Sequence, residues 1–152
     1  MLKKLLNRDT IRLQVNVDSW EEAGNRVGDL LLENDLIEPD YINRMIEAVH
    51  EYGPYIVIAP GIALFHARPE SSVKEICLSM ITLKEPVEFG AGENDPVDLV
   101  FALGAIDQNS HLELMAGLMT ILQDADLLKK IKLETSTNEV LNLISEKLSK
   151  EE

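Results

Sequence analysis

Short apolar runs and longer amphipathic stretches succeed one another along this chain, and the two patterns predict different elements. The apolar runs predict five strands, over residues 11–17, 55–59, 62–66, 75–83 and 97–105. The first run alternates apolar and polar residues, as a half-buried strand does. The last three runs are nearly continuously apolar, which is typical of strands that are covered on both faces.

The amphipathic stretches between and after these runs predict helices. Ser19 and Glu22 form a capping box at the start of a helix over residues 19–34. Pro39 suits the first turn of a second helix, which Gly53 and Pro54 end. Three further helices are expected, over residues 110–122, 124–131 and 136–148. The order of elements predicts an α/β fold, a five-stranded mixed, largely parallel sheet flanked by helices on both faces.

The length of 152 residues predicts one domain that covers residues 1–152 and buries a core of its own. Apolar runs of 18 or more residues, which a membrane-spanning helix needs, do not occur in the sequence. The first ten residues also lack the apolar core of a secretory signal. We therefore expect a cytoplasmic protein without direct membrane insertion. The single cysteine, Cys77, lies in an apolar run and is expected to be a buried, inert thiol.

A formal net charge of −13 disfavours binding to nucleic acid, because that binding depends on lysine and arginine contacts to phosphates. The same charge permits a basic protein partner, although it also fits a protein that is simply kept soluble by its charge. The sequence lacks a phosphate-binding loop, a dinucleotide fingerprint and a nucleophile elbow. Its three histidines lack the spacing of a zinc motif, so we expect neither a cofactor nor a metal.

Two histidines stand where chemistry is possible. His66 closes the predicted strand 62–66, and a neutral imidazole at a sheet rim is a competent nucleophile near pH 7. Arg68 could lend a fixed charge to phosphoryl oxygens. Ser110 and Glu113 form a second capping box, which predicts Ser110 as the N-cap and His111 as the first helical residue, where an anion is stabilised. Each feature alone also fits an ordinary structural role.

Taken together, two segments resemble a known family. The stretches "PGIALFHARPE" and "PVEFGAGENDPVDLVFALGAIDQNSHLELMAGL" resemble the IIA component of the bacterial phosphoenolpyruvate-dependent sugar phosphotransferase system, of the mannitol/fructose superfamily with its G-I-A-x-P-H core. The segment "YGPYIVIAPGIALFHARPE" is most similar to the ascorbate-type branch. The resemblance covers essentially the whole chain.

The resemblance implies a five-stranded mixed sheet and a phosphocarrier role in coupled sugar uptake. It implies that His66 accepts a phosphoryl group from the phosphocarrier protein HPr and passes it to a cysteine of a IIB component. The IIB component then serves a membrane IIC component. By the same resemblance, His111 helps to hold the phosphoryl group. A homodimer is left open.

Two positions depart from the family pattern. Phe65 stands where the family usually has proline, so we expect a less rigid backbone there. His50 falls where mannitol-type members carry a functional arginine. A protonated His50 could serve part of that role, or it could be a solvent-facing residue at a helix end.

The residues around His66 are expected to form the surface that meets a partner. Ile62, Leu64 and Phe65 would contribute a dry rim, although most of them are also expected to belong to the core. Phe65, Arg68 and Glu70 would select the matching IIB component. Two other functions stay open. The chain could be a regulatory phosphoacceptor that signals through protein binding, or a scaffold or ligand-binding domain that has lost the chemistry.

Overall fold

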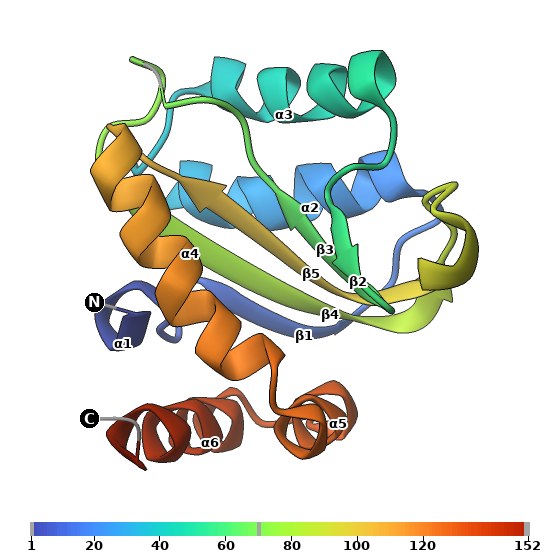
Figure 1. The fold of residues 1–152 in the computed structure, drawn as a ribbon, viewed down its shortest axis with the longest axis vertical. Helices are drawn as coiled ribbons and strands as arrows, with labels where there is room; N and C mark the ends of the chain where they lie inside the picture. The colour runs from blue at the N-terminus through green and yellow to red at the C-terminus, as the bar shows by residue number, and fades with distance from the viewer. Residues whose placement is uncertain (1, 70, 151–152) are drawn as a thin grey trace.

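The computed structural model describes residues 2–69 and 71–150, which Figure 1 colours from the N-terminus to the C-terminus. The strands are β1 (Ile11–Val15), β2 (Val57–Ala59), β3 (Ile62–Phe65), β4 (Cys77–Val87) and β5 (Val97–Gly104). The helices are α1 (Leu2–Leu5), α2 (Trp20–Glu33), α3 (Pro39–Tyr52), α4 (Gln108–Leu122), α5 (Ala125–Leu133) and α6 (Thr137–Lys150), with a short 3-10 turn η1 (Gly92–Asn94).

The strands form one sheet in the order β1-β4-β5-β3-β2. Strand β1 pairs with β4, and β3 pairs with β5, in parallel. The pairs β4–β5 and β2–β3 are antiparallel. The predicted five-stranded mixed sheet is confirmed, and parallel pairing makes up two of the four contacts between strands in the described residues.

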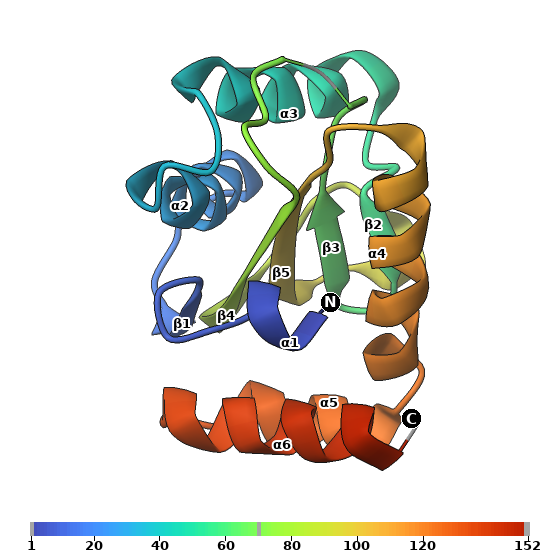
Figure 2. The same cartoon turned by 90° about the vertical axis from the view of Figure 1, so that its left-hand side faces the viewer.

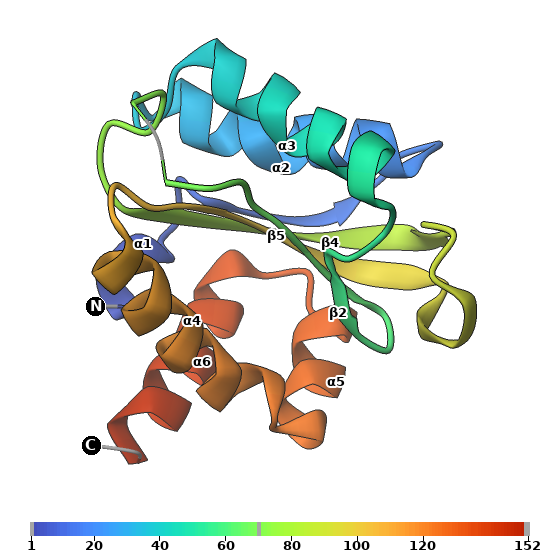
Figure 3. The ribbon, with the colours of Figure 1, turned by 45° about the horizontal axis from the view of Figure 1, so that its top comes forward.

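Helices cover both faces of the sheet, as predicted. Helices α2 and α3 lie on one face, and α1, α4, α5 and α6 lie on the other (Figure 3). Successive residues of β3 point to opposite faces, so Leu64 packs in the core beneath α4 and Phe65 packs in the core beneath α2 and α3. This double coverage explains why the strands read as nearly continuous apolar runs.

The first two long helices begin and end close to the predicted residues. The Ser19 side chain accepts a hydrogen bond from the Glu22 backbone N–H at 3.1 Å and so caps α2. Helix α3 starts with Pro39 at its first position. It ends before Gly53, whose φ of 85° lies in a region that glycine adopts at little cost.

The start of α4 differs from the prediction. Asp107, not Ser110, is the N-cap, and its Oδ1 atom accepts a hydrogen bond from the Ser110 backbone N–H at 2.7 Å. Ser110 is therefore the third helical residue and His111 the fourth. The predicted capping box of Ser110 and Glu113 is wrong, because the carboxylate three residues before Ser110 already satisfies the free N–H groups of the first turn.

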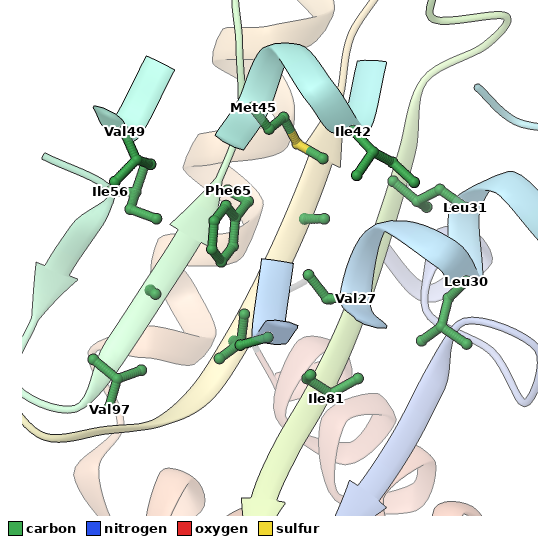
Figure 4. Packing of buried hydrophobic residues seen from close by; sticks show 14 of the residues in the cluster. Val27, Leu30, Leu31, Ile42, Met45, Val49, Ile56, Phe65, Ile81 and Val97 are labelled. Carbon is green, nitrogen blue, oxygen red and sulfur yellow. The ribbon is translucent and has the colours of Figure 1, made fainter. Parts of the chain in front are cut away.

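Phe65 is a core residue, fully buried between β3 and the two helices above it (Figure 4). Its ring lies 6.5 Å from Trp20 and 5.9 Å from Phe89, measured between ring centroids. A Cβ atom on Gly24 would approach Phe65 Cε1 to 2.8 Å, so α2 needs glycine there to admit the ring. Truncating a buried phenylalanine typically costs about 3–5 kcal/mol, which keeps this side chain in the core.

The predicted dry rim of Ile62, Leu64 and Phe65 is therefore wrong, whereas the expectation that most of them belong to the core is confirmed, because all three side chains are buried. They lie on a strand that is paired on both sides and covered on both faces, so a partner does not reach them. Cys77 is buried as predicted, and burial raises the pKa of its thiol to about 12. Among the described residues, no helix is both long and apolar enough to cross a bilayer.

Candidate functional site

Three segments that are distant in the sequence meet at one end of the sheet. The carboxyl end of β3, the start of α4 and helix α3 lie together there (Figure 2). The parallel pairing of β3 with β5, with Phe65 opposite Ala102, places the residues that follow both strands at the same edge. His66 follows β3, and His111 lies in the first turns of α4, so the fold brings the two predicted histidines together.

His66 is half-buried, and its ring is held by its own strand. The Nδ1 atom lies 2.8 Å from the backbone carbonyl oxygen of Leu64. Since a carbonyl can only accept, Nδ1 carries the proton in this contact and Nε2 carries a lone pair. One ring nitrogen is thus held by a fixed acceptor, and the other is left for chemistry.

His111 faces His66 from the start of α4. The ring centroids of the two histidines lie 5.8 Å apart, with an interplanar angle of 51°. Within the described residues, His111 Nδ1 is buried and meets no hydrogen-bond partner. Burial, followed by the charge on His66, lowers the pKa of His111 below its ordinary value of 6.5. His111 is therefore a neutral imidazole at pH 7, and its ring lies beside the His66 ring.

This lowered pKa predicts a pH dependence. Between pH 6.5 and the pKa in the folded protein, the unfolded chain binds a proton at His111 that the folded chain does not. The contribution of His111 to the free energy of unfolding should thus be unaffected above pH 6.5 and decrease as the pH falls through this window. An NMR titration of the ring should place the His111 pKa below 6.5. In a His66→Ala variant, the pKa should rise part of the way back, because burial remains. A value at or above 6.5 in the wild type would contradict this account.

The two histidines line an open cleft of about 960 Å³ between α3 and the start of α4. Helix α3 contributes residues 44, 47, 48, 51 and 52, and the first four recur at the helical spacing of one face. Arg68 lines the cleft from the segment after β3, as predicted. Arg44 and Arg68 thus bring two guanidinium groups to a cleft that also contains the carboxylates of Glu47 and Glu51.

His50 lies outside this cleft. It is exposed in the last turn of α3, and its ring packs 5.0 Å from Trp20, measured between centroids. The helical period accounts for this position, since a residue at 50 projects away from the face that residues 47 and 51 share. The expected role of His50 in the site is not supported, whereas its reading as a solvent-facing residue at a helix end agrees with the structure.

Arg44 is the site residue that the sequence reading missed. The helical spacing contained this information, because Arg44 shares one helical face with residues 47, 48 and 51, which lie three, four and seven residues after it. That face could be assigned to the cleft only once the positions of α3 and β3 were known. An arginine of α3 thus lines the cleft, but at position 44 rather than at position 50, where mannitol-type members of the family carry one.

The start of α4 does not offer the anion site expected of it. Hydrogen bonds, foremost the one from the Ser110 backbone N–H, hold the pKa of Asp107 below its ordinary value, so this cap is ionised. A carboxylate thus occupies the N–H groups that an anion would need. Ser110 does not line the cleft, and its hydroxyl donates to the Asp107 carbonyl oxygen at 3.2 Å. The side chains of His111, Arg44 and Arg68 line the cleft in its place. The described residues contain no group of three or more side chains suited to hold a metal ion.

Known proteins resemble this chain over most of its length. The profile of the family described as "Phosphoenolpyruvate-dependent sugar phosphotransferase system, EIIA 2" matches residues 4–147. The chain is 38% identical to the ascorbate-specific PTS system EIIA component of Escherichia coli K12, over 92% of both chains.

Solved structures of similar proteins share the fold. A putative PTS IIA (PtxA) from Streptococcus mutans is 30% identical, with a TM-score of 0.85 over 92% of this chain and 89% of that one. Enzyme IIAMtl, solved in complex with phosphorylated enzyme IIBMtl from Escherichia coli, is 25% identical, with a TM-score of 0.79 over 92% of this chain and 96% of that one. The likeness in sequence and fold extends over nearly the whole chain, which therefore belongs to the EIIA 2 family of the phosphoenolpyruvate-dependent sugar phosphotransferase system.

Proposed function

We propose that this chain is a cytoplasmic phosphocarrier that forms a single IIA domain and accepts a phosphoryl group on His66. The donor is HPr, and the acceptor is a cysteine of a IIB component that serves a membrane IIC component. The observation that carries the proposal is the contact of His66 Nδ1 with the Leu64 carbonyl at 2.8 Å, in a cleft lined by two arginines. That contact leaves Nε2 with a lone pair toward an incoming phosphorus atom.

The proposed transfer needs no other reactant. The lone pair of His66 Nε2 forms the new N–P bond while the bond between phosphorus and the donor histidine breaks, and the donor imidazole keeps that electron pair. In the second step, a cysteine thiolate of IIB attacks phosphorus, and the pair of the N–P bond returns to His66. Because both steps move a phosphoryl group with little other bond chemistry, positioning and charge stabilisation supply most of the catalysis.

Three side chains are placed to stabilise the phosphoryl oxygens during these steps. His111 lies beside the His66 ring, and Arg44 and Arg68 line the same cleft. A negative phosphoryl group on His66 favours the protonated form of His111, whose pKa is lowered in the unphosphorylated protein. We therefore propose that His111 takes up a proton when His66 is phosphorylated and releases it on onward transfer.

The partner surface lies around the mouth of the cleft. Ile106 and Leu112 flank the first turns of α4 and are 53% and 58% exposed. Large apolar side chains with this exposure suit a protein contact. The similar protein IIAMtl has been solved in complex with its phosphorylated IIB component, which supports IIB as a partner of this chain. The net charge of −13 favours partners with a basic docking face. A homodimer is compatible with this scheme but not needed for it.

The ascorbate-type assignment rests on the ascorbate-specific relative. A IIA protein contacts proteins rather than the sugar, so its substrate class is set by which IIB component it serves. Arg68 lies at the cleft and suits this selection, whereas Phe65 is buried and does not. Glu70, the third residue expected to select the partner, lies outside the described residues.

Transfer to a panel of IIB components tests the assignment. The protein is first phosphorylated with phosphoenolpyruvate, enzyme I and HPr, and is then offered purified IIB components of the ascorbate, galactitol, mannitol and fructose types. We expect the fastest transfer to the ascorbate type. Faster transfer to the mannitol or fructose type would overturn the branch assignment and leave the phosphocarrier role intact. A protein that is labelled but passes its phosphoryl group to none of the four would instead fit a regulatory phosphoacceptor.

A further inference from the structure

The peptide bond that follows His66 is held on both sides by tyrosine hydroxyl groups. The Tyr55 hydroxyl donates to the carbonyl oxygen of His66 at 3.1 Å. The backbone N–H of the next residue, Ala67, donates to the Tyr41 hydroxyl at 3.1 Å. The carbonyl of His66 and the N–H of Ala67 belong to one planar peptide unit, so the two contacts together fix its orientation.

The two tyrosines are anchored differently. Tyr41 lies on α3 and is fully buried, and its hydroxyl donates to the Leu103 carbonyl oxygen of β5 at 2.7 Å. This chain of contacts ties the His66–Ala67 peptide to the central strand of the sheet. Tyr55 comes from the segment between α3 and β2 and is 42% exposed. Its ring meets the His66 ring edge-on, with centroids 5.4 Å apart and an interplanar angle of 78°.

These contacts lie just after the end of strand β3, where its hydrogen bonds to the sheet stop. Strand β3 ends at Phe65, so His66 and Ala67 have left the ladder of hydrogen bonds that holds β3 against β5. The contact of His66 Nδ1 with Leu64 spans only two residues and orients the ring relative to its own backbone. The direction of Nε2 toward the cleft therefore depends on how the following peptide is held.

We propose that Tyr55 and Tyr41 are positioning residues for His66, and that they fix the His66–Ala67 peptide so that Nε2 points into the cleft. The inference rests on the proposed function of His66 as the phosphoryl acceptor. Reacting atoms must be aligned closely for transfer, and small displacements are costly. Burial, followed by the charge of Tyr52, raises the pKa of Tyr55, so its hydroxyl keeps the proton that it donates.

Tyr55→Phe is the informative variant, because it removes one hydroxyl and keeps the ring against His66. We expect phosphorylation of His66 by HPr to slow by about 3- to 10-fold, the scale of one lost hydrogen bond. Tyr55→Leu also removes the ring and should slow it further. His50→Ala is the control, since it changes an exposed residue of α3 that lies outside the cleft, and it should leave the rate unchanged.

A second measurement works on the unphosphorylated protein and does not depend on labelling. The ring nitrogens of His66 should show the form with a proton on Nδ1 in the wild type and in His50→Ala. In Tyr55→Phe, the ring signals should shift toward a mixture of the two tautomers, and the Ala67 amide should exchange faster with solvent. A purely structural role of Tyr55 would lower the melting temperature without moving the His66 ring signals.

The outcomes separate this inference from the proposed function. A wild-type protein that is not labelled at His66 contradicts the phosphocarrier role, while the ring signals still decide whether the tyrosines position His66. A labelled wild type, together with unchanged ring signals and an unchanged rate in Tyr55→Phe, overturns the positioning role alone.

Discussion

Replacing His66 by alanine is expected to abolish phosphorylation of this protein by phosphoenolpyruvate, enzyme I and HPr. The substitution deletes the imidazole that lines the cleft and whose Nε2 atom carries a lone pair while Nδ1 is held. His111 does not replace it, because its Nδ1 atom is buried and its ring lies beside the acceptor position rather than at it. Intact-mass analysis should show one acid-labile phosphoryl group on the wild type and none on His66→Ala.

His50→Ala is the matched control for this loss. It removes a histidine that is exposed, packs on Trp20 and lies outside the cleft, so labelling should match the wild type. The His66→Ala protein should stay folded, because His66 is only half-buried and the Tyr55 and Tyr41 hydroxyls contact backbone atoms that alanine retains. Equal labelling of His66→Ala and the wild type would remove His66 from the acceptor role.

Replacing His111 by alanine is expected to leave labelling at His66 in place and to slow onward transfer to a cognate IIB component. His111 faces the His66 ring across 5.8 Å and is placed to interact with the phosphoryl oxygens. Losing one group that stabilises charge in a transition state typically lowers a rate by about 10²-fold or more. Rapid-quench measurement of phosphoryl transfer from the labelled variant to IIB gives the size of the effect.

Glu113→Ala is a suitable control on the same helix. Glu113 is exposed on α4, and the structure shows that the start of this helix is capped by Asp107 rather than by a box that includes Glu113. Its removal should leave both labelling and transfer unchanged. Unchanged transfer in His111→Ala would reduce His111 to a residue of the first turns of α4, whereas loss of labelling would make it part of the acceptor itself.

Local pattern determined most of the secondary structure of this chain. The sequence pattern predicted all five strands of the described sheet. Strand β1 followed from alternation of apolar and polar residues, and strands covered on both faces followed from runs that are apolar at nearly every position. Pro39 and Gly53 marked the ends of α3 correctly, since the constraints of proline and glycine act on their own backbone. The fold class and the pairing of His66 with His111 as site candidates could likewise be read from sequence and family resemblance.

The tertiary structure decided which side chains face the cleft. His50 and Arg44 lie on the same helix, but only the packing of α3 against the end of β3 shows that Arg44 faces the cleft and His50 faces Trp20. Two capping patterns overlapped at the start of α4, and the position of the helix end selected Asp107 over Ser110.

The environment of His66 also depended on contacts that no local pattern contains. Phe65 is buried because α2 presents Gly24 opposite its ring, and this fit joins residues far apart in the sequence. The hydroxyls of Tyr41 and Tyr55 reach the peptide after His66 from positions 26 and 11 residues away from their partners. The sequence by itself determined where strands and helices form and which histidines are candidates for chemistry. Only the packing of α3 and α4 against the sheet decided what surrounds those histidines, because packing alone brings distant residues into contact.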